Sequence, residues 1–318
     1  METQRRNNKT FERIICSRCV MDKSAPETMF DENGVCNFCH QAQQSLKEIE
    51  RDKDKLPHLI KVIKDQENTY DCIIGLSGGV DSAFALHKAV ELGLKPLCFS
   101  VDNGWQSPKA QENIMKLVEG MRVPFYRYKI DLGEFRDIQS AFIKAGQRNL
   151  EIPTDHILMA ATYDMARQYN IKWILSGGNV ATESIMPASW GYNARDLVHI
   201  KDVYKTTKGK KIKHSPTLSL LKWNWYKWGR GVKMLYLLDY MDYNRGEAIE
   251  ILHQKYGFED YGEKHCESLF TWWFQNFYLF EKFGIDKRKP HLSSLINSGQ
   301  MSREEAMIEL QKIVTGKQ

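Results

Sequence analysis

The sequence lacks any run of about eighteen apolar residues, which is the length that a helix needs to cross a bilayer. Its first nine residues are polar and lack the apolar core of a secretory signal. We therefore expect a cytoplasmic protein with no membrane partner. A strong net charge is absent as well, because 45 basic and 40 acidic residues leave only +5. This balance does not favour nucleic acid as a partner, although it permits an anionic substrate.

A disulfide framework is also not indicated, because seven cysteines, an odd number, occur in a chain expected in the cytoplasm. Four of them form two Cys-x-x-Cys pairs separated by sixteen residues, Cys16 with Cys19 and Cys36 with Cys39. This spacing predicts one tetrahedral Zn²⁺, and four protein ligands leave no open position for catalysis. The alternatives are an iron–sulfur cluster, a thioredoxin-like redox pair, and His40 in place of Cys39 as a ligand. We expect residues 1–45 to be a zinc-binding module with four cysteine ligands.

The usual P-loop, Gly-x-x-x-x-Gly-Lys-Ser/Thr, is missing around the main glycine-rich turn, which argues against an ordinary ATPase or kinase. This turn follows an apolar run and precedes a helix-compatible segment. Adjacent glycines let backbone amides converge on an anion at the start of a helix, and Asp81 can orient a Mg²⁺ bound to phosphates. A plain turn is the alternative. The predicted nucleotide-binding residues are Leu76, Ser77, Gly78, Gly79, Val80, Asp81 and Ser82.

The motif Ser77-Gly-Gly-Val-Asp-Ser82 after a buried strand resembles the pyrophosphate loop (PP-loop) of the N-type ATP pyrophosphatases. That family includes GMP synthetase, argininosuccinate synthetase and several tRNA-modifying enzymes. The resemblance implies an adenine nucleotide alpha hydrolase-like fold and ATP as cosubstrate. It also implies that the loop holds the leaving pyrophosphate while a substrate oxygen attacks the α-phosphate.

Strand and helix patterns alternate after residue 70. The expected strands are residues 71–76, 95–101, 125–130 and 173–175, and the expected helices are residues 83–92, 108–119 and 155–169. This alternation predicts an α/β fold with a doubly wound parallel sheet over residues 70–215, whose ligands bind beyond the carboxyl ends of the strands. We expect residues 46–69 to form a connector helix interrupted near Pro57. Residues 216–318 are expected to form a helical, aromatic-rich region that binds the acceptor or a partner.

Two further loops end strands at the same predicted edge of the sheet. Asp102-Asn103-Gly104 resembles a loop beside the adenosine in GMP synthetases, with an ordinary turn as the alternative. Gly177-Gly178-Asn179 resembles the second glycine-rich turn of those enzymes. Glu183 is the candidate for a second acidic residue near magnesium or the acceptor, and a glutamate that merely opens the next helix is the alternative.

The segment of residues 187–214 is polar and basic without a clear period. We expect a long excursion over the active-site face, which either closes on a phosphorylated acceptor or is solvated. Basic residues in two polar segments nearer the C-terminus predict an anion site, because Arg binds phosphate through paired hydrogen bonds and Lys and His add charge. A surface charge cluster is the alternative. The candidates are Lys264, His265, Lys287, Arg288 and His291.

Several motifs recur together in order over nearly the full chain, from Ile15 to about Leu310. They are Cys16-Ser-Arg-Cys-Val-Met-Asp22, Phe30-Asp-Glu-Asn-Gly-Val-Cys36, Ser77–Ser82, Lys264-His265, Glu267-Ser268 and Lys282-Phe-Gly-Ile-Asp-Lys-Arg288. As a set they resemble the bacterial N-acetyl sugar amidotransferases of lipopolysaccharide and O-antigen pathways. The resemblance implies that ATP and ammonia convert the acetamido group of an N-acetylated, nucleotide-linked sugar into an acetamidino group, releasing AMP and pyrophosphate. It makes Asp81, Glu183, Lys264 and His265 the catalytic candidates and gives Cys266 no role.

A glutaminase signature is missing, since Cys72 and Cys98 lie in apolar strands and no Gly-x-Cys-x-Gly elbow surrounds them. We therefore predict a separate glutaminase subunit that supplies ammonia, as the resemblance also implies. The strongest rival function is a PP-loop tRNA-modifying enzyme of the thiolation or lysidine type. The scattered remaining cysteines and the small net charge argue against it. A non-catalytic nucleotide-binding protein would leave the PP-loop without a task.

Overall fold

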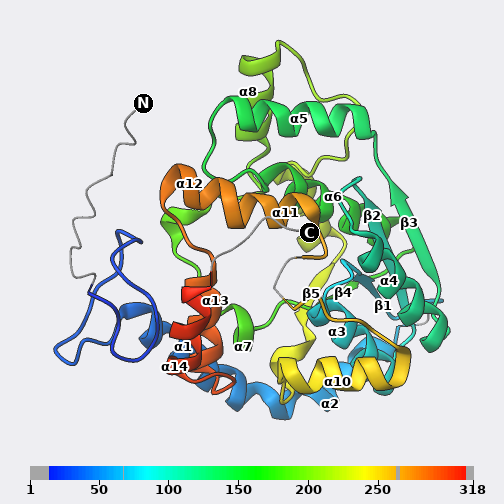
Figure 1. Cartoon of the computed structure of the whole chain (residues 1–318). Helices are drawn as coiled ribbons and strands as arrows, with labels where there is room; N and C mark the ends of the chain where they lie inside the picture. Colours follow the sequence, from blue (N-terminus) through cyan, green and yellow to red (C-terminus); the bar gives the residue numbers. More distant parts are fainter. Residues whose placement is uncertain (1–13, 67, 263–265, 313–318) are drawn as a thin grey trace.

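The computed structural model describes residues 14–66, 68–262 and 266–312. At its centre is a five-stranded parallel sheet in the order β3-β2-β1-β4-β5 (Figure 1). The strands are β1 (Cys72–Gly75), β2 (Pro96–Asp102), β3 (Phe125–Lys129), β4 (Trp173–Ser176) and β5 (Lys233–Tyr236). The first four confirm the predicted parallel sheet. The strand β5 was not predicted, because it is only four residues long and lies in the region that we expected to be helical.

The helices surround this sheet and fill the rest of the described chain. The longer ones are α1 (Asn37–Asp52), α2 (Leu56–Lys64), α3 (Val80–Glu91), α4 (Pro108–Met121), α5 (Leu132–Lys144), α6 (Ile152–Gln168), α8 (Leu197–Lys208), α10 (Arg245–Tyr256), α13 (Arg288–Asn297) and α14 (Arg303–Gln311). The shorter ones are α7 (Val180–Glu183), α9 (Leu220–Asn224), α11 (Leu269–Trp273) and α12 (Leu279–Phe283), with single turns η1 (Lys53–Lys55), η2 (Ala188–Trp190), η3 (Trp225–Gly229), η4 (Leu237–Tyr240) and η5 (Phe274–Tyr278). None of the helices in the described part of the chain combines the length and apolar character that crossing a bilayer demands.

Both faces of the sheet are covered, as alternating strand side chains require. On one face, Ile73 and Phe99 belong to a core that also contains Ala160 and Ala161 of α6. On the other face, Ile74 and Cys98 share a core with residues of α3 and α4. The loops at the carboxyl ends of β1 and β4 are thus held between two packed layers.

The segment of residues 187–214 is not the irregular excursion that we expected from its composition. It contains the helix α8, which buries Leu197, Ile200 and Tyr204 on one side and packs on α5. The helix α5 was missed as well. Its Asp137 pairs with Lys208 at 2.9 Å and with Lys210 at 2.6 Å, so these lysines bind a structural carboxylate.

The connector between the four-cysteine module and the sheet was predicted in outline. It consists of α1, the single turn η1 and α2, and Pro57 lies in the first turn of α2, where a missing amide N–H breaks no helical hydrogen bond. The helix α1 already begins at Asn37, inside the second Cys-x-x-Cys pair. It packs against α13, so the two ends of the described chain lie side by side (Figure 1).

Candidate functional site

The turn after β1 has the geometry of an anion-binding loop. Gly78 adopts φ +92°, and a Cβ there would lie 2.8–2.9 Å from atoms of Ala110, so only glycine fits. The hydroxyl of Ser77 accepts the Gly79 N–H at 3.1 Å and lies 3.3 Å from the hydroxyl of Ser82. The helix α3 then starts at Val80 without a side-chain cap, so its positive end faces the loop.

A second glycine turn, after β4, meets the PP-loop backbone directly. A Cβ on Gly177 would lie 2.6 Å from the Ser82 nitrogen and 2.7 Å from the Asp81 carbonyl carbon. The two loops therefore touch through main chain, which glycine alone permits at this distance. This close approach joins the predicted loops at one edge of the sheet.

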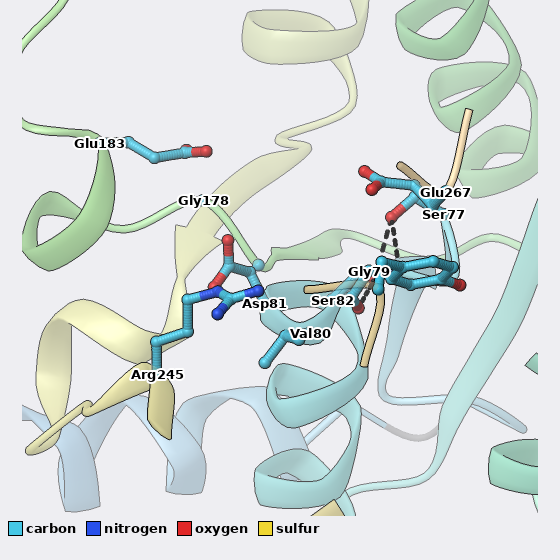
Figure 2. Close-up of a pocket in the computed structure, with 11 residues that line it drawn as sticks. Ser77, Gly79, Val80, Asp81, Ser82, Gly178, Glu183, Arg245 and Glu267 are labelled. Atoms are coloured by element: carbon cyan, nitrogen blue, oxygen red, sulfur yellow. Dashed lines mark hydrogen bonds between the residues drawn. The ribbon is translucent and has the colours of Figure 1, made fainter. Parts of the chain in front are cut away.

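A C-terminal segment lies over the PP-loop from the other side. The Tyr261 hydroxyl donates to the Gly78 carbonyl oxygen at 3.0 Å, and burial raises the pKa of this phenol well above its ordinary value. The Ser107 N–H donates to the Glu267 carbonyl oxygen at 2.9 Å, which fixes the Glu267 backbone beside the start of α4. The Glu267 side chain lies above Ser77 in Figure 2.

Asp81 is held by a residue that the sequence did not identify. The Tyr243 hydroxyl donates a short hydrogen bond to Asp81 Oδ1, and the Tyr243 ring packs on Phe84 with centroids 5.6 Å apart. Burial, with the Asp81 carboxylate second, raises the pKa of Tyr243 far above its ordinary value, so the phenol is a permanent donor. The side chain of Gln300 accepts the Arg245 N–H at 2.8 Å and donates to the Tyr243 carbonyl oxygen at 3.0 Å, which clips this segment in place.

These elements line a small, partly open cavity of about 200 Å³ that carries three carboxylates and one guanidinium group. Figure 2 shows the guanidinium group of Arg245 pointing toward Asp81, with Glu183 on the opposite side of the Gly178 turn. The Arg245 guanidinium is 3.1 Å from Asp260. The lining residues are Ser77, Gly79, Val80, Asp81, Ser82, Gly177, Gly178, Glu183, Arg245, Tyr261 and Glu267.

A second, larger cavity of about 680 Å³ adjoins the first, because Glu183 and Arg245 line both. Its walls combine aromatic side chains, among them Trp190, Tyr192 and Trp272, with polar and charged groups. A mixed lining of this kind suits a ligand with both ring faces and anionic groups.

The structure brings three of the predicted acceptor residues to this larger cavity, namely Lys287, Arg288 and His291. The Arg288 guanidinium donates to both carboxylate oxygens of Asp286, at 3.0 and 2.7 Å, and to carbonyl oxygens at the end of α14. The Arg288 guanidinium must give up some of these contacts before it can bind a substrate. The His291 Nδ1 lies 3.3 Å from the Thr182 carbonyl oxygen. Lys264 and His265 lie outside the described residues and stay predictions.

Other residues that were predicted to bind the nucleotide do not line either cavity. The motif Asp102-Asn103-Gly104 lines neither cavity, and its side chains accept the backbone N–H groups of its own turn, as the turn alternative expects. Asn179 caps α7 by accepting the Thr182 N–H at 2.9 Å and is buried. Leu76 is buried in the sheet core. These contacts shape the loops, and a role of these residues in nucleotide binding stays a prediction.

The larger cavity also holds a pair of carboxylates, Glu151 and Asp155, near the start of α6. Burial, with the neighbouring Glu151 second, raises the pKa of Asp155 to about 8, while Lys287 opposes the shift. Asp155 is nevertheless an exposed residue because it faces the open cavity, and solvent there reduces the shift that its protein surroundings cause.

The four predicted metal ligands come together as one buried cluster. The sulfur atoms of Cys16, Cys19, Cys36 and Cys39 all lie within 4.8 Å of one another, and this donor set can hold a metal ion. His40 is not part of the cluster, since its Nε2 lies 2.8 Å from Asp31. The alternative in which His40 replaces Cys39 is therefore wrong.

The four-cysteine module is built into the C-terminal helices. Asn297 of α13 donates to the Cys39 sulfur at 3.3 Å, and Arg303 of α14 donates to the carbonyl oxygens of Cys16 and Cys19. The same helix α13 carries His291 at the larger cavity. The module thus supports one wall of that cavity.

Sequence reasoning missed Tyr243, Arg245 and Tyr261, and it noted Glu267 only as part of a motif. The order Asn244-Arg245-Gly-Glu247 is a readable helix start, because Asn244 accepts the amides of the first turn. Nothing in the sequence shows that this start faces Asp81, about 160 residues away. That proximity arises from the packing of α10 on α3 and from the contacts of Gln300 with this segment.

Three solved structures resemble the fold at low identity. The U34-tRNA thiolase NcsA from Methanococcus maripaludis with its [4Fe-4S] cluster is 12% identical, with 96% of this chain and 91% of that chain covered and a TM-score of 0.40. The NH3-dependent NAD synthetase from Campylobacter jejuni is 15% identical, with 70% and 94% covered and a TM-score of 0.32. The NMN synthetase from Francisella tularensis is 15% identical, with 62% and 97% covered and a TM-score of 0.31.

Sequence comparisons are more specific. The uncharacterized protein MJ1599 of Methanocaldococcus jannaschii is 23% identical over 305 residues, which are 93% of each chain. Residues 267–318 match the C-terminal domain of LPS biosynthesis protein WbpG-like proteins, in agreement with the resemblance found in the motifs. Residues 54–215, about half of the chain, match the NAD synthase model. The chain therefore belongs to the NAD synthase family of PP-loop proteins and carries the C-terminal domain of a WbpG-like lipopolysaccharide biosynthesis protein.

Proposed function

We propose that this protein is the synthetase subunit of an ATP-dependent N-acetyl sugar amidotransferase in surface polysaccharide biosynthesis. It adenylates the acetamido oxygen of a nucleotide-linked sugar and then replaces that oxygen with ammonia. The PP-loop domain supports the use of ATP, and the WbpG-like domain supports the lipopolysaccharide context.

The observation that carries the proposal is the shared wall of the two cavities. The phosphate-sized cavity lies over the PP-loop, and the larger cavity has the room for a sugar with a nucleotide carrier. Glu183 and Arg245 line both, so an acceptor in the larger cavity meets a nucleotide at the PP-loop. Adenylation needs this arrangement, because the acceptor oxygen must approach the α-phosphate as pyrophosphate leaves.

The proposed reaction balances as two displacements. The amide oxygen attacks the α-phosphorus of ATP, a P–O bond forms, and the bond to pyrophosphate breaks. Ammonia then adds to the activated carbon, a proton is lost, and AMP departs with the former amide oxygen. Adenylation is required because oxide is a very poor leaving group, whereas AMP leaves readily.

Charged residues of the site divide between the two tasks. Asp81, Glu183 and Glu267 are carboxylates at the small cavity and can hold a Mg²⁺ bound to the phosphates. Arg245 is the candidate to stabilise negative charge that develops as pyrophosphate leaves. Lys287 and His291 are candidates to bind the anionic carrier, with Lys264 and His265 added by resemblance.

We assign a single Zn²⁺ to the four-cysteine cluster. The distances between cysteine sulfurs are 3.7 Å for Cys19 and Cys36 and 3.9 Å for Cys16 and Cys39. Zinc–sulfur bonds of about 2.3 Å in a tetrahedron give an edge of about 3.8 Å. A four-iron cluster binds each thiolate to a different iron atom and needs a wider cage. The bound ion would supply a rigid crosslink and no catalytic chemistry.

Ammonia is proposed to come from a separate glutaminase subunit. Of the cysteines near the sheet, Cys72 and Cys98 are fully buried, and burial raises the pKa of Cys98 to about 12 and that of Cys72 well above its ordinary range. Neither thiol is a suitable nucleophile for glutamine. The protein alone should therefore use ammonium salts and fail with glutamine.

The decisive experiment is a product assay with ATP, Mg²⁺, ammonium and a panel of nucleotide-linked acetamido sugars. Sugar-dependent release of AMP and pyrophosphate, with one sugar oxygen replaced by NH in the mass spectrum, is the expected result. Arg245→Gln should lower kcat/KM by about tenfold to a hundredfold, since it removes one charged donor from the transition state. Arg230→Gln, a basic residue outside both cavities, is the matched control.

A tRNA-modifying enzyme is the competing outcome. AMP release that depends on tRNA and not on any sugar would assign the site to RNA modification. Cys72 and Cys98 are buried in the sheet, and burial raises the pKa of both thiols, so neither supplies the reactive or cluster-binding cysteine that a thiolase needs near the nucleotide.

A further inference from the structure

A short helical segment presents apolar side chains to solvent instead of burying them. It consists of α9 and the turn η3 that follows it without a break, residues 220–229. Leu221, Trp225 and Trp228 are spaced four and three residues apart, so they share one side of the helix. Leu221 is 82% and Trp228 75% exposed, whereas Tyr226 on the opposite side is fully buried. An exposed apolar stripe of this kind marks an interaction surface.

The segment that carries these exposed side chains is firmly attached to α6. The Tyr226 hydroxyl donates to Asp164 at 2.8 Å, and the Tyr226 ring packs on Tyr163 with centroids 5.2 Å apart. Lys222 adds an ion pair with Asp164 at 2.9 Å. The buried side of the helix is therefore fixed on α6, and the apolar stripe points away from the core as a consequence.

The charged residues of the segment itself are all basic. Residues 220–230 contain Lys222, Lys227 and Arg230 and no Asp or Glu, and Lys222 is paired with Asp164 of α6. The Lys227 ammonium lies 5.0 Å from the ring of Trp223 and 5.1 Å from that of Trp228, and the Arg230 guanidinium lies 5.6 Å from the ring of Trp225. Trp223 is partly buried, but Trp225 and Trp228 are exposed, so Lys227 and Arg230 can reach an anionic surface while these two rings enter it.

The combination of exposed apolar and basic side chains decides which kind of partner fits this surface. A second copy of this chain would bring the same positive surface against itself and be repelled. Single-stranded nucleic acid stacks on rings, but Leu220 and Leu221, which are 71% and 82% exposed, offer none. An anionic lipid surface accepts leucine and tryptophan in its interfacial layer and lysine and arginine at its headgroups.

We propose that residues 220–230 dock this protein reversibly on an anionic lipid bilayer. This docking is peripheral and departs from our expectation of no membrane partner. The sequence alone does not show that these apolar side chains point outward. The surface adjoins the larger cavity. Arg195 stacks over Trp223 at 5.1 Å, and Tyr192, three residues earlier, lines that cavity.

Vesicle flotation tests this proposal without reference to catalysis. The full chain is mixed with vesicles of phosphatidylcholine alone or with one third phosphatidylglycerol. We expect binding to the anionic vesicles only, and weaker binding as salt rises. The double variant Leu221→Ser with Trp228→Ser should lose at least about tenfold in partition, because both inserted apolar groups are removed. Ile308→Ser, a similarly exposed apolar residue on α14, is the matched control and should bind as wild type does.

Three results would overturn the proposal. The first is absence of wild-type binding to anionic vesicles, and the second is unchanged binding of the double variant. The third is binding of single-stranded RNA that depends on Trp228 when no vesicle binding occurs, which would assign the surface to nucleic acid. Circular dichroism of each variant checks that the fold is retained. Because no step uses substrate turnover, these outcomes are independent of the proposed sugar chemistry.

Discussion

Replacing Gly177 with alanine tests whether the contact between the two glycine turns creates the phosphate site. The new Cβ would lie 2.6 Å from the Ser82 nitrogen, and ordinary contact begins near 3.4 Å, so the loops must separate by about 0.8 Å. The opposing atoms are backbone at the start of α3 and cannot rotate away. A misplacement of about 1 Å at a reacting centre can cost on the order of a hundredfold in rate. We expect a loss of that size in sugar-dependent AMP release.

The same substitution should destabilise the fold only moderately. Overpacking of this kind costs about 1–3 kcal/mol, which lowers the Tm of a protein of this size by several degrees. Gly178→Ala is the matched control, because its Cβ would meet only side-chain atoms of Ser176 and Tyr236 at 3.3 Å. The assay compares kcat/KM for ATP and Tm for both variants. Activity of Gly177→Ala within threefold of Gly178→Ala would refute the idea that this backbone contact sets the loop geometry.

Three further predictions follow from the site. Tyr243→Phe removes the donor to Asp81 and should raise the Mg²⁺ concentration for half-maximal activity by about tenfold, which is about 1.4 kcal/mol. Tyr256→Phe removes a hydrogen bond to His87 and should leave this Mg²⁺ concentration unchanged. If both variants need the same Mg²⁺ concentration, Tyr243 does not have this role. Cys39→Ser should lower bound zinc from about one ion per chain and reduce Tm, while His40→Ala keeps the metal; zinc loss in the latter would contradict the assigned ligand set. Asp155 has a folded pKa raised to about 8, so the folded state binds its proton more tightly than the unfolded state, and stability falls as pH rises from about 4 towards 8. Asp155→Asn should therefore raise Tm more at pH 8 than at pH 5, and a pH-independent difference would show that this carboxyl does not titrate in that window.

The sequence predicted the parts of this protein whose signals are local. Four strands, the PP-loop and the four-cysteine cluster each depend on a short pattern, namely an apolar run, a glycine pair and two cysteine pairs. The strand β5 was missed because it is four residues long, and the helix α8 because it lies within a polar, basic segment without a clear period. Burial of Leu197, Ile200 and Tyr204 decides the fold of α8, and Lys208 at its end pairs with Asp137 of α5.

Residues that reach the site from a distance could not be predicted. Tyr243 and Arg245 follow a short edge strand, and their approach to Asp81 depends on the docking of α10 and on the clip by Gln300. Arg288 has a structural role that the sequence did not indicate. Its basic character suggested phosphate binding, but paired contacts with Asp286 and the end of α14 show that it also serves the packing of the C-terminal helices.

The clip made by Gln300 has a consequence for how the chain can be divided. This side chain lies between α13 and α14 and fixes both Tyr243 and Arg245, so the last helices determine the shape of a pocket whose first residue is Ser77. A shortened chain that ends at residue 215 would keep the glycine loop and lose β5, Arg245, Tyr261 and Glu267. We therefore expect nucleotide binding to require the finished fold, and a chain shortened to the N-terminal two thirds of the protein to bind ATP more weakly than the full chain.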